Sequence, residues 1–100
     1  MNNSKVNIET AQKLLKVVSR TGIVEVLLNL ENGPKKFSQL MFDTQLNPGI
    51  LDRHLKALLN VGLVEKDSEN YVLTKTGKIV LDKLAELVAA YESVFLNCKK

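Results

Sequence analysis

The sequence is poor in the residues that cross-link a chain or bind metals. Its 100 residues include one cysteine, one histidine, two prolines and no tryptophan. Cys98 has no second cysteine with which to form an internal disulfide or a metal-binding cluster. Near the end of the sequence it is interpreted as a small apolar side chain rather than a reactive thiol. This cysteine usage fits a reducing compartment such as the cytoplasm.

The sequence also lacks the segments that direct a protein to a membrane. No apolar run approaches the roughly 18 residues that a membrane-spanning helix needs. The opening residues, MNNSKVNIET, lack the charged start, the apolar stretch and the small-residue cleavage site of a secretory signal. We therefore expect a cytoplasmic protein with no membrane partner.

Motifs of catalysis are missing as well. The sequence has no glycine-rich phosphate loop, no nucleophile elbow, and no histidine paired with a serine or cysteine motif. Its carboxylates are scattered over predicted surfaces. We expect no catalytic residues, no metal and no cofactor, and hence a protein that is not an enzyme.

The residues that are present suit one compact domain over residues 1–100, because 45% are apolar and 25% are charged. The net charge of +3 permits attraction to a polyanion. It is too small to indicate a protein that coats DNA without regard to sequence. Between Lys35 and Lys78, seven basic and five acidic residues leave a net charge of only +2.

Three helices are expected in the first half of the chain. Asn7 can cap the first, which ends near RTG, and Thr21 can cap the second, which stops at Gly33 and Pro34. Ser38 can cap a third helix of about two turns. The second helix is apolar nearly all round, so it should be the centre of the core. The apolar residues expected on the inner faces of the other two are Ile8, Ala11, Leu14, Leu15, Val18, Leu40 and either Met41 or Phe42.

A further helix begins at Asn47, an N-cap followed by Pro48 at the first helical position, where the missing N–H is no loss. Gly62 ends it. His54 lies on its apolar side and is interpreted as a packed ring rather than a ligand or base. The other residues of that side are Ile50, Leu51, Leu55, Leu58, Leu59 and Val61. The opposite side carries Gly49, Asp52, Arg53, Lys56 and Asn60.

The segments LVEK and NYVL, separated by DSE, predict a two-stranded β-hairpin. Thr74 can cap the last helix, whose apolar residues repeat at alternating spacings of four and three, as in a coiled coil. That seam consists of Val80, Leu84, Leu87, Tyr91, Val94 and Cys98, with Leu81, Val88 and Phe95 in a second line beside it.

Together the two lines cover roughly 140° of the last helix, more than the ~100° needed to dock one helix on one core. The economical partner for the remainder is the same helix of a second copy, which gives a two-fold homodimer. The predicted dimer interface is Val80, Leu84, Leu87, Val88, Tyr91, Val94, Phe95 and Cys98. The alternative is a monomer whose first helix covers the extra strip through Leu14, Leu15 and Val18.

The order of these elements and three segments resemble small prokaryotic transcription regulators. ENGPKKFSQL, LNPGILDRHLKALLNVGLVEK and YVLTKTG are similar to the matching segments of the ArsR and MarR types and their archaeal relatives, over about Thr21 to Leu84. The resemblance implies a mainly α (α+β) fold, the winged helix-turn-helix, with core and wing over residues 21–74 and a long dimerisation helix over residues 75–98. It implies a homodimeric transcription regulator that binds double-stranded DNA, its recognition helix in the major groove and its wing on the backbone or minor groove.

The exposed side of the helix from Asn47 suits a DNA groove independently of the resemblance. Gly49 allows close approach, Arg53 can bond to O6 and N7 of guanine, and Lys56 can reach a phosphate. Free N–H groups at the Asn47 end suit a phosphate oxygen. The alternative for the charged residues is a solvated surface, and Ser38 is equally explained as a cap. The candidate DNA-binding residues are Lys35, Lys36, Ser38, Asn47, Gly49, Asp52, Arg53, Lys56, Lys66, Asn70 and Tyr71.

Asp52 departs from the family pattern, which often has serine or threonine at this place. Phosphates repel a carboxylate unless it accepts a hydrogen bond from a cytosine amino group or pairs with Arg53 or Lys56. The wing tip DSE is a second departure, since it carries two acids where many wings carry arginine or lysine. The remaining wing contacts would be Lys66, Asn70 and Tyr71.

Other functions stay open at this point. Winged helices also serve as protein-binding modules of larger assemblies, and an acidic wing with a weak net charge would fit that role. A small effector could bind between the dimer helices beside Tyr91 and Phe95, although aromatic residues at this spacing are more often ordinary core. Metal sensing is not carried over, because the cysteine, histidine and carboxylate sets of metal-sensing ArsR proteins are missing.

Overall fold

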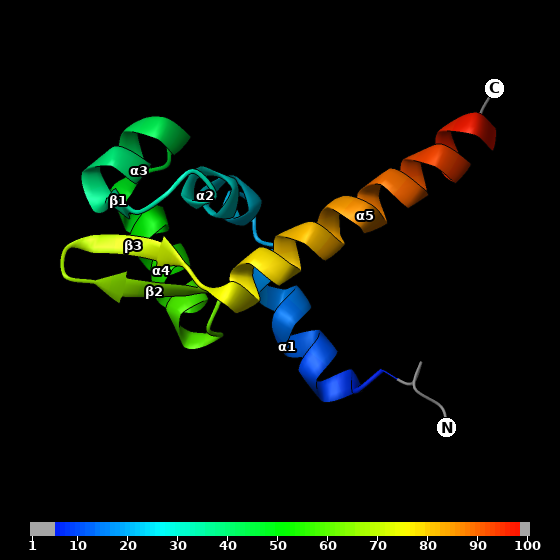
Figure 1. Ribbon diagram of the computed structural model, residues 1–100, viewed down its shortest axis with the longest axis horizontal. Coiled ribbons are helices and arrows are strands. Elements are labelled where there is room, and N and C mark those ends of the chain that lie inside the picture. The colour runs from blue at the N-terminus through cyan, green and yellow to red at the C-terminus, as the bar shows by residue number, and fades with distance from the viewer. Residues whose placement is uncertain (1–5, 99–100) are drawn as a thin grey trace.

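The computed structural model describes residues 6–98 and has a mainly α architecture with one small sheet. Figure 1 shows a compact body from which the C-terminal helix extends as a long arm, away from the hairpin. None of the helices within residues 6–98 is both long and apolar enough to span a membrane. The elements are α1 (Ile8–Val18), α2 (Ile23–Leu30), β1 (Lys35–Lys36), α3 (Phe37–Thr44), α4 (Pro48–Asn60), β2 (Val64–Asp67), β3 (Asn70–Leu73) and α5 (Lys75–Cys98).

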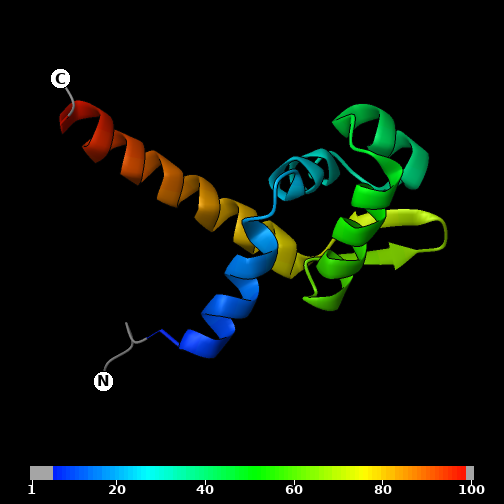
Figure 2. The ribbon, with the colours of Figure 1, turned by 180° about the vertical axis from the view of Figure 1, so that it is seen from behind.

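Helix α1 is capped as its sequence predicts, and it buries part of the predicted face. The Asn7 side-chain oxygen accepts a hydrogen bond from the N–H of Thr10 at 2.9 Å. Ile8 and Leu15, expected on the inner face, are exposed, whereas Val17 is buried. Leu14 and Val18 pack against the core as predicted, so the prediction was wrong only for Ile8 and Leu15. Helix α1 touches the body mainly near its C-terminal end, as Figure 2 shows.

Helix α2 forms the centre of the core, as predicted, but it begins without a side-chain cap. Gly22, with φ of +97°, occupies the N-cap position that had been expected for Thr21. A Cβ at Gly22 would lie 3.0 Å from the side chain of Leu46, so close packing as well as the backbone angle favours glycine. The buried residues of α2 are Ile23, Val26, Leu27 and Leu30.

The sheet has a third strand that the sequence did not indicate. Two-residue β1 pairs antiparallel with β3, and the strand order is β1-β3-β2. The chain passes directly from β1 into α3, so Lys36 precedes the helix and Ser38 lies inside it rather than at its N-cap. The prediction of a Ser38 cap was therefore wrong. Within α3, Leu40 is fully buried and Phe42 is exposed.

The predicted hairpin is present. Strand β3 is the expected segment NYVL, whereas β2 is VEKD, one residue later than the expected LVEK. Val64 pairs with Leu73 and Asp67 with Asn70, which leaves a two-residue turn. Ser68 in that turn has a φ of +59°. The hairpin extends from the body beside α3, as seen in Figure 1.

Helix α4 begins and ends at the residues predicted for it. The Asn47 side-chain oxygen accepts the N–H groups of Gly49 and Ile50, and Pro48 fills the first helical position. At the other end Gly62 has a φ of +76°. The N–H of Leu63 bonds back to the carbonyl of Leu58, the pattern of a helix closed by a left-handed glycine.

Helix α5 is joined to the hairpin by a tightly bonded corner. Thr74 caps it, as predicted, by accepting the N–H of Gly77 at 3.0 Å, and the Thr74 hydroxyl donates to the carbonyl of Gly62 at 2.7 Å. Gly77 is buried, and a Cβ there would collide with the carbonyl of Leu63 and the side chain of Leu73. Glycine is therefore required where α5 crosses the start of the hairpin.

Candidate nucleic-acid interface

Helix α4 presents two different sides, and the structure places them as the sequence predicts. Leu51, His54, Leu55 and Leu58 are buried in the core, while Ile50 and Leu59 lie at its margin with a little over a third of their surface exposed. On the opposite side Gly49, Arg53, Lys56 and Asn60 are exposed, and Asp52 is half-buried. No part of the chain within residues 6–98 covers the charged side of this helix.

The charged groups on this side differ in their partners. The Lys56 ammonium forms an ion pair with the carboxylate of Asp52 at 2.9 Å across one turn of the helix. Among the described residues Arg53 has no ion-pair or hydrogen-bond partner. Asp52 thus pairs with Lys56, one of the alternatives that the sequence left open, and the guanidinium of Arg53 is available to an incoming group.

The first turn of α4 has fewer free N–H groups for a phosphate than its sequence indicated. The N–H groups of Gly49 and Ile50 already donate to the Asn47 side chain, and Pro48 has no N–H. The expectation of free amides at this end was wrong, because the same residue that caps the helix consumes them.

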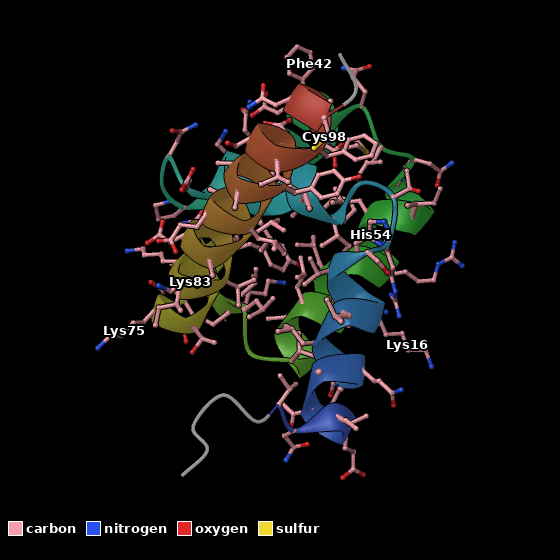
Figure 3. The ribbon with its side chains drawn as sticks, turned by 90° about the vertical axis from the view of Figure 1, so that its right-hand side faces the viewer. Lys16, Phe42, His54, Lys75, Lys83 and Cys98 are labelled. Atoms are coloured by element: carbon pink, nitrogen blue, oxygen red, sulfur yellow. The ribbon has the colours of Figure 1, made fainter. Side chains whose placement is uncertain are left out.

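His54 fixes α4 to the connection between α1 and α2. Its Nε2 lies 2.7 Å from the carbonyl oxygen of Thr21, so Nε2 carries the proton and donates it. Its Nδ1 is buried and has no hydrogen-bond partner in the described chain. Figure 3 shows the ring beside the connecting segment. The reading of His54 as a packed structural residue is confirmed.

Lys35 joins three elements rather than projecting freely. Its ammonium lies 2.8 Å from Asp43 of α3 and 3.4 Å from the side-chain oxygen of Asn29 in α2. Gln39 donates to the other oxygen of Asp43 at 2.9 Å. The hydrogen bond from Lys35 lowers the pKa of Asp43 below its ordinary value, against an opposing effect of desolvation and with help from Gln39. Lys35 therefore holds α3 in place.

The wing and the start of α3 supply fewer open cations than α4. Lys36 lies 3.8 Å from Glu69 at the wing tip, in an exposed pair. The Lys66 ammonium lies 5.1 Å from the centre of the Tyr71 ring, a cation–π distance. Tyr71 itself is buried, so its ring belongs to the core rather than to the open surface. Ser38 is exposed in the first turn of α3 and Asn70 is half-buried at the hairpin end.

The comparisons with known proteins agree with this geometry. The model of the bacterial regulatory protein family arsR matches residues 22–66. A MarR-family transcriptional regulator from Enterococcus faecalis V583 has a TM-score of 0.79 at 22% identity, covering 99% of this chain and 97% of that one. The chain is a winged helix-turn-helix protein. No curated protein matches it.

Two further structures support the winged helix-turn-helix fold. Quinone-bound YodB from B. subtilis has a TM-score of 0.77 at 20% identity, covering 85% of this chain and 98% of that one. The homodimeric winged helix-turn-helix DNA-binding domain of Mb0332 from Mycobacterium bovis has a TM-score of 0.67 at 20% identity, covering 84% and 82%. In this winged-helix chain α3 and α4 form the helix-turn-helix, and β2 and β3 form the wing. The matching family is described as bacterial regulatory proteins, and the Enterococcus faecalis protein as a transcriptional regulator of the MarR family.

The arm of the winged-helix chain carries the apolar strip predicted for a dimer. Only Gly77 and Leu81 of α5 are buried, and every residue from Ala85 to Cys98 is exposed. Tyr91 and Phe95 stack at 5.0 Å between ring centres. Helix α1 diverges from α5 (Figure 1), so it does not cover the strip beyond Leu87. The monomer alternative therefore fails to account for the second half of α5.

The sequence missed one feature that shapes this surface. The Lys35–Asp43 pair was not foreseen, since it exists only after α3 has folded back over β1. A signal for part of it was present, because Gln39 and Asp43 are four residues apart on one helix. No group of three or more histidine, cysteine or carboxylate side chains within residues 6–98 is placed to hold a metal.

Proposed function

We propose that this winged-helix chain is a cytoplasmic transcription regulator that binds a specific double-stranded DNA sequence as a homodimer. One observation carries the proposal: α4 turns its leucines inward and leaves Arg53, without a partner in the described chain, on an uncovered side beside Lys56. A helix of this kind fits the major groove with its N-terminal turns toward the base edges.

The residues of α4 divide into two kinds of contact. Arg53 donates two hydrogen bonds to O6 and N7 of a guanine, which is the contact that reads sequence. Gly49, exposed and without a side chain, lets the helix backbone approach the groove. Lys56 reaches a phosphate and contributes affinity rather than selectivity. On the wing, Lys66 and Asn70 approach the DNA backbone, whereas Lys35 and Tyr71 act indirectly by holding α3 and the sheet.

The homodimer assembles through the apolar strip of α5. Mb0332, a structural relative, is described as homodimeric, and here the exposed strip has the heptad spacing of a helix pair. A single domain with a net charge of +2 over its DNA-facing region gains little from counterion release. Two copies on one duplex double that gain, so the site should consist of two similar halves about one helical turn or more apart.

Duplex binding by charge-removing variants tests the proposal. We expect Arg53→Ala to weaken binding to the preferred site about tenfold or more, and Lys56→Ala to weaken all duplexes alike and flatten the salt dependence. Lys83→Ala is the matched control, because Lys83 is an equally exposed lysine in an ion pair on α5. If both α4 variants bind DNA as tightly as the unchanged chain at low and moderate salt, the proposal is wrong.

A protein-binding module is the second candidate. The wing tip favours it, because Glu69 pairs with Lys36 and leaves Asp67 as a further exposed acid where DNA-binding wings carry positive charge. The same titration separates the two functions. A module of this kind would show weak binding that fades with salt and has no preferred sequence.

A further inference from the structure

Asp52 is the only acidic residue of α4, and it lies in the second turn on the uncovered side of the helix. Its carboxylate forms one ion pair, with Lys56, and has no other partner among residues 6–98. Its side chain is 49% exposed, against 72% for Lys56. Arg53 follows it directly in the sequence. A negative charge thus sits among the groups that would face DNA.

The pair with Lys56 is readily exchanged. Exposed ion pairs contribute little to stability, since water and salt screen both charges. A phosphate competes well for the lysine, because the duplex carries a dense line of negative charge. Once Lys56 has moved to a phosphate, Asp52 keeps its place nearer the N-terminal end of the helix. This is the end that approaches the base edges.

A carboxylate at the base edges requires a donor. An ionised carboxylate only accepts hydrogen bonds. In the major groove guanine and thymine present acceptors, and only the amino groups of cytosine and adenine donate. Adenine carries the N7 acceptor beside its amino group, whereas cytosine presents no acceptor there. We propose that Asp52 selects a cytosine in each half of the site, an inference that rests on the proposed function.

A purely electrostatic role for Asp52 has a different signature. If the carboxylate only restrained Lys56 and repelled phosphates, its removal would strengthen binding to every duplex by the same factor. Selection by Asp52 instead predicts that its removal helps only those duplexes that lack the cytosine. The base at one position, rather than total affinity, is therefore the quantity to measure.

The experiment selects binding sites from randomised duplexes with the full chain and its variants. We expect the unchanged chain to enrich a cytosine at one position of each half-site. Asp52→Ala should lose the preference at that position alone, so that the affinity ratio between the cytosine site and a thymine-substituted site falls about tenfold. Asp52→Asn should shift the preference to adenine, because an amide can both accept from N6 and donate to N7.

Glu86→Gln is the matched control, since it removes the same charge from an exposed ion pair with Lys83 on α5. Its enriched sequence should equal that of the unchanged chain. Identical position-by-position preferences for the unchanged chain and Asp52→Ala would overturn the inference and leave the proposed function standing. No enriched sequence for the unchanged chain would overturn both. Circular dichroism of each variant verifies that the helices are intact.

Discussion

Helices α4 and α5 are both amphipathic, yet the chain covers the apolar side of α4 along its length and that of α5 only near its start. Leu51, Leu55 and Leu58 of α4 are at most 1% exposed. On α5 the residues of comparable size, Leu87 and Val94, are 65% and 67% exposed. The periodicity of a helix therefore predicts that its apolar side will be covered. It does not predict whether the same chain or a second chain covers it. Cover by the same chain and cover by a second chain differ in how they respond to substitution.

The largest effect is expected in the core-facing side of α4. Leu55→Ala should lower the free energy of unfolding by about 2–5 kcal/mol, since it removes buried methyl groups and leaves a cavity. Chemical denaturation measures the loss. Leu87→Ala, the corresponding change on α5, should leave the unfolding of the dilute protein nearly unchanged. Equal losses for the two variants would show that the apolar sides of α4 and α5 are covered alike.

A charge introduced on the exposed apolar side of α5 should weaken dimer assembly. Val94→Lys places an ammonium in the apolar strip, where a dimer would bury it, so the dimer should dissociate at concentrations about a hundredfold higher than for the unchanged chain. Sedimentation or light scattering over a concentration series gives the dissociation constant. Asp82→Lys, on the opposite side of the same helix, is the control and should leave assembly intact. An unchanged dissociation constant for Val94→Lys would show that this strip is not part of the dimer interface.

At the junction between the wing and α5, a Gly→Ala substitution should destabilise the protein rather than stabilise it. In an exposed helix Gly→Ala stabilises, but Gly77→Ala adds a methyl group that collides with the Leu63 carbonyl. We expect a loss of about 1–3 kcal/mol in thermal or chemical unfolding. Gly49→Ala is the control, because its methyl group would meet only the Asn47 side-chain oxygen at 3.2 Å. Stabilisation by Gly77→Ala would contradict the tight crossing of α5 and the hairpin.

The smallest effect concerns the Lys35–Asp43 pair, which ties α3 to β1. The folded state lowers the pKa of Asp43, so the pair stabilises the protein above the ordinary carboxyl pKa of 3.8, and this contribution disappears as pH falls through the lower folded value. Asp43→Asn should therefore be slightly less stable than the unchanged chain at pH 7. The two should converge in acid.

Denaturation at both pH values measures this convergence. In a Lys35→Met background the cost of Asp43→Asn at pH 7 should shrink, because the charged partner has already gone. A difference between the unchanged chain and Asp43→Asn that persists at the lowest pH would assign the effect to packing rather than to the ion pair.

The elements that depend on local rules were predictable from sequence. The caps at Asn47 and Thr74 and the glycine closure at Gly62 each follow from one residue and its neighbours, and all three are present. The exposed position of Arg53 followed from the helical period alone. The hairpin followed from two β-rich segments with turn residues between them.

The elements that depend on distant partners were not predictable. Strand β1 is two residues long and exists only because β3 lies beside it. Ser38 is not a cap because that pairing carries the chain straight into α3. The buried face of α1 was predicted only in part, because the burial of Val17 depends on neighbouring helices whose placement no local pattern contains. The Lys35–Asp43 pair is unpredictable for the same reason.

The hydrogen bonds of Thr74 connect helix α5 to the end of the helix-turn-helix. The Thr74 hydroxyl accepts the N–H of Gly77 and donates to the carbonyl of Gly62, and the Thr74 N–H donates to the carbonyl of Leu63. Thr74 therefore binds the first turn of α5 to the segment that directly follows α4. In a dimer joined through α5, a movement of this helix would therefore move α4 with it. In the proposed dimer, any rotation between the two α5 helices would change the distance between the two Arg53 side chains, and with it the half-site spacing that the protein accepts.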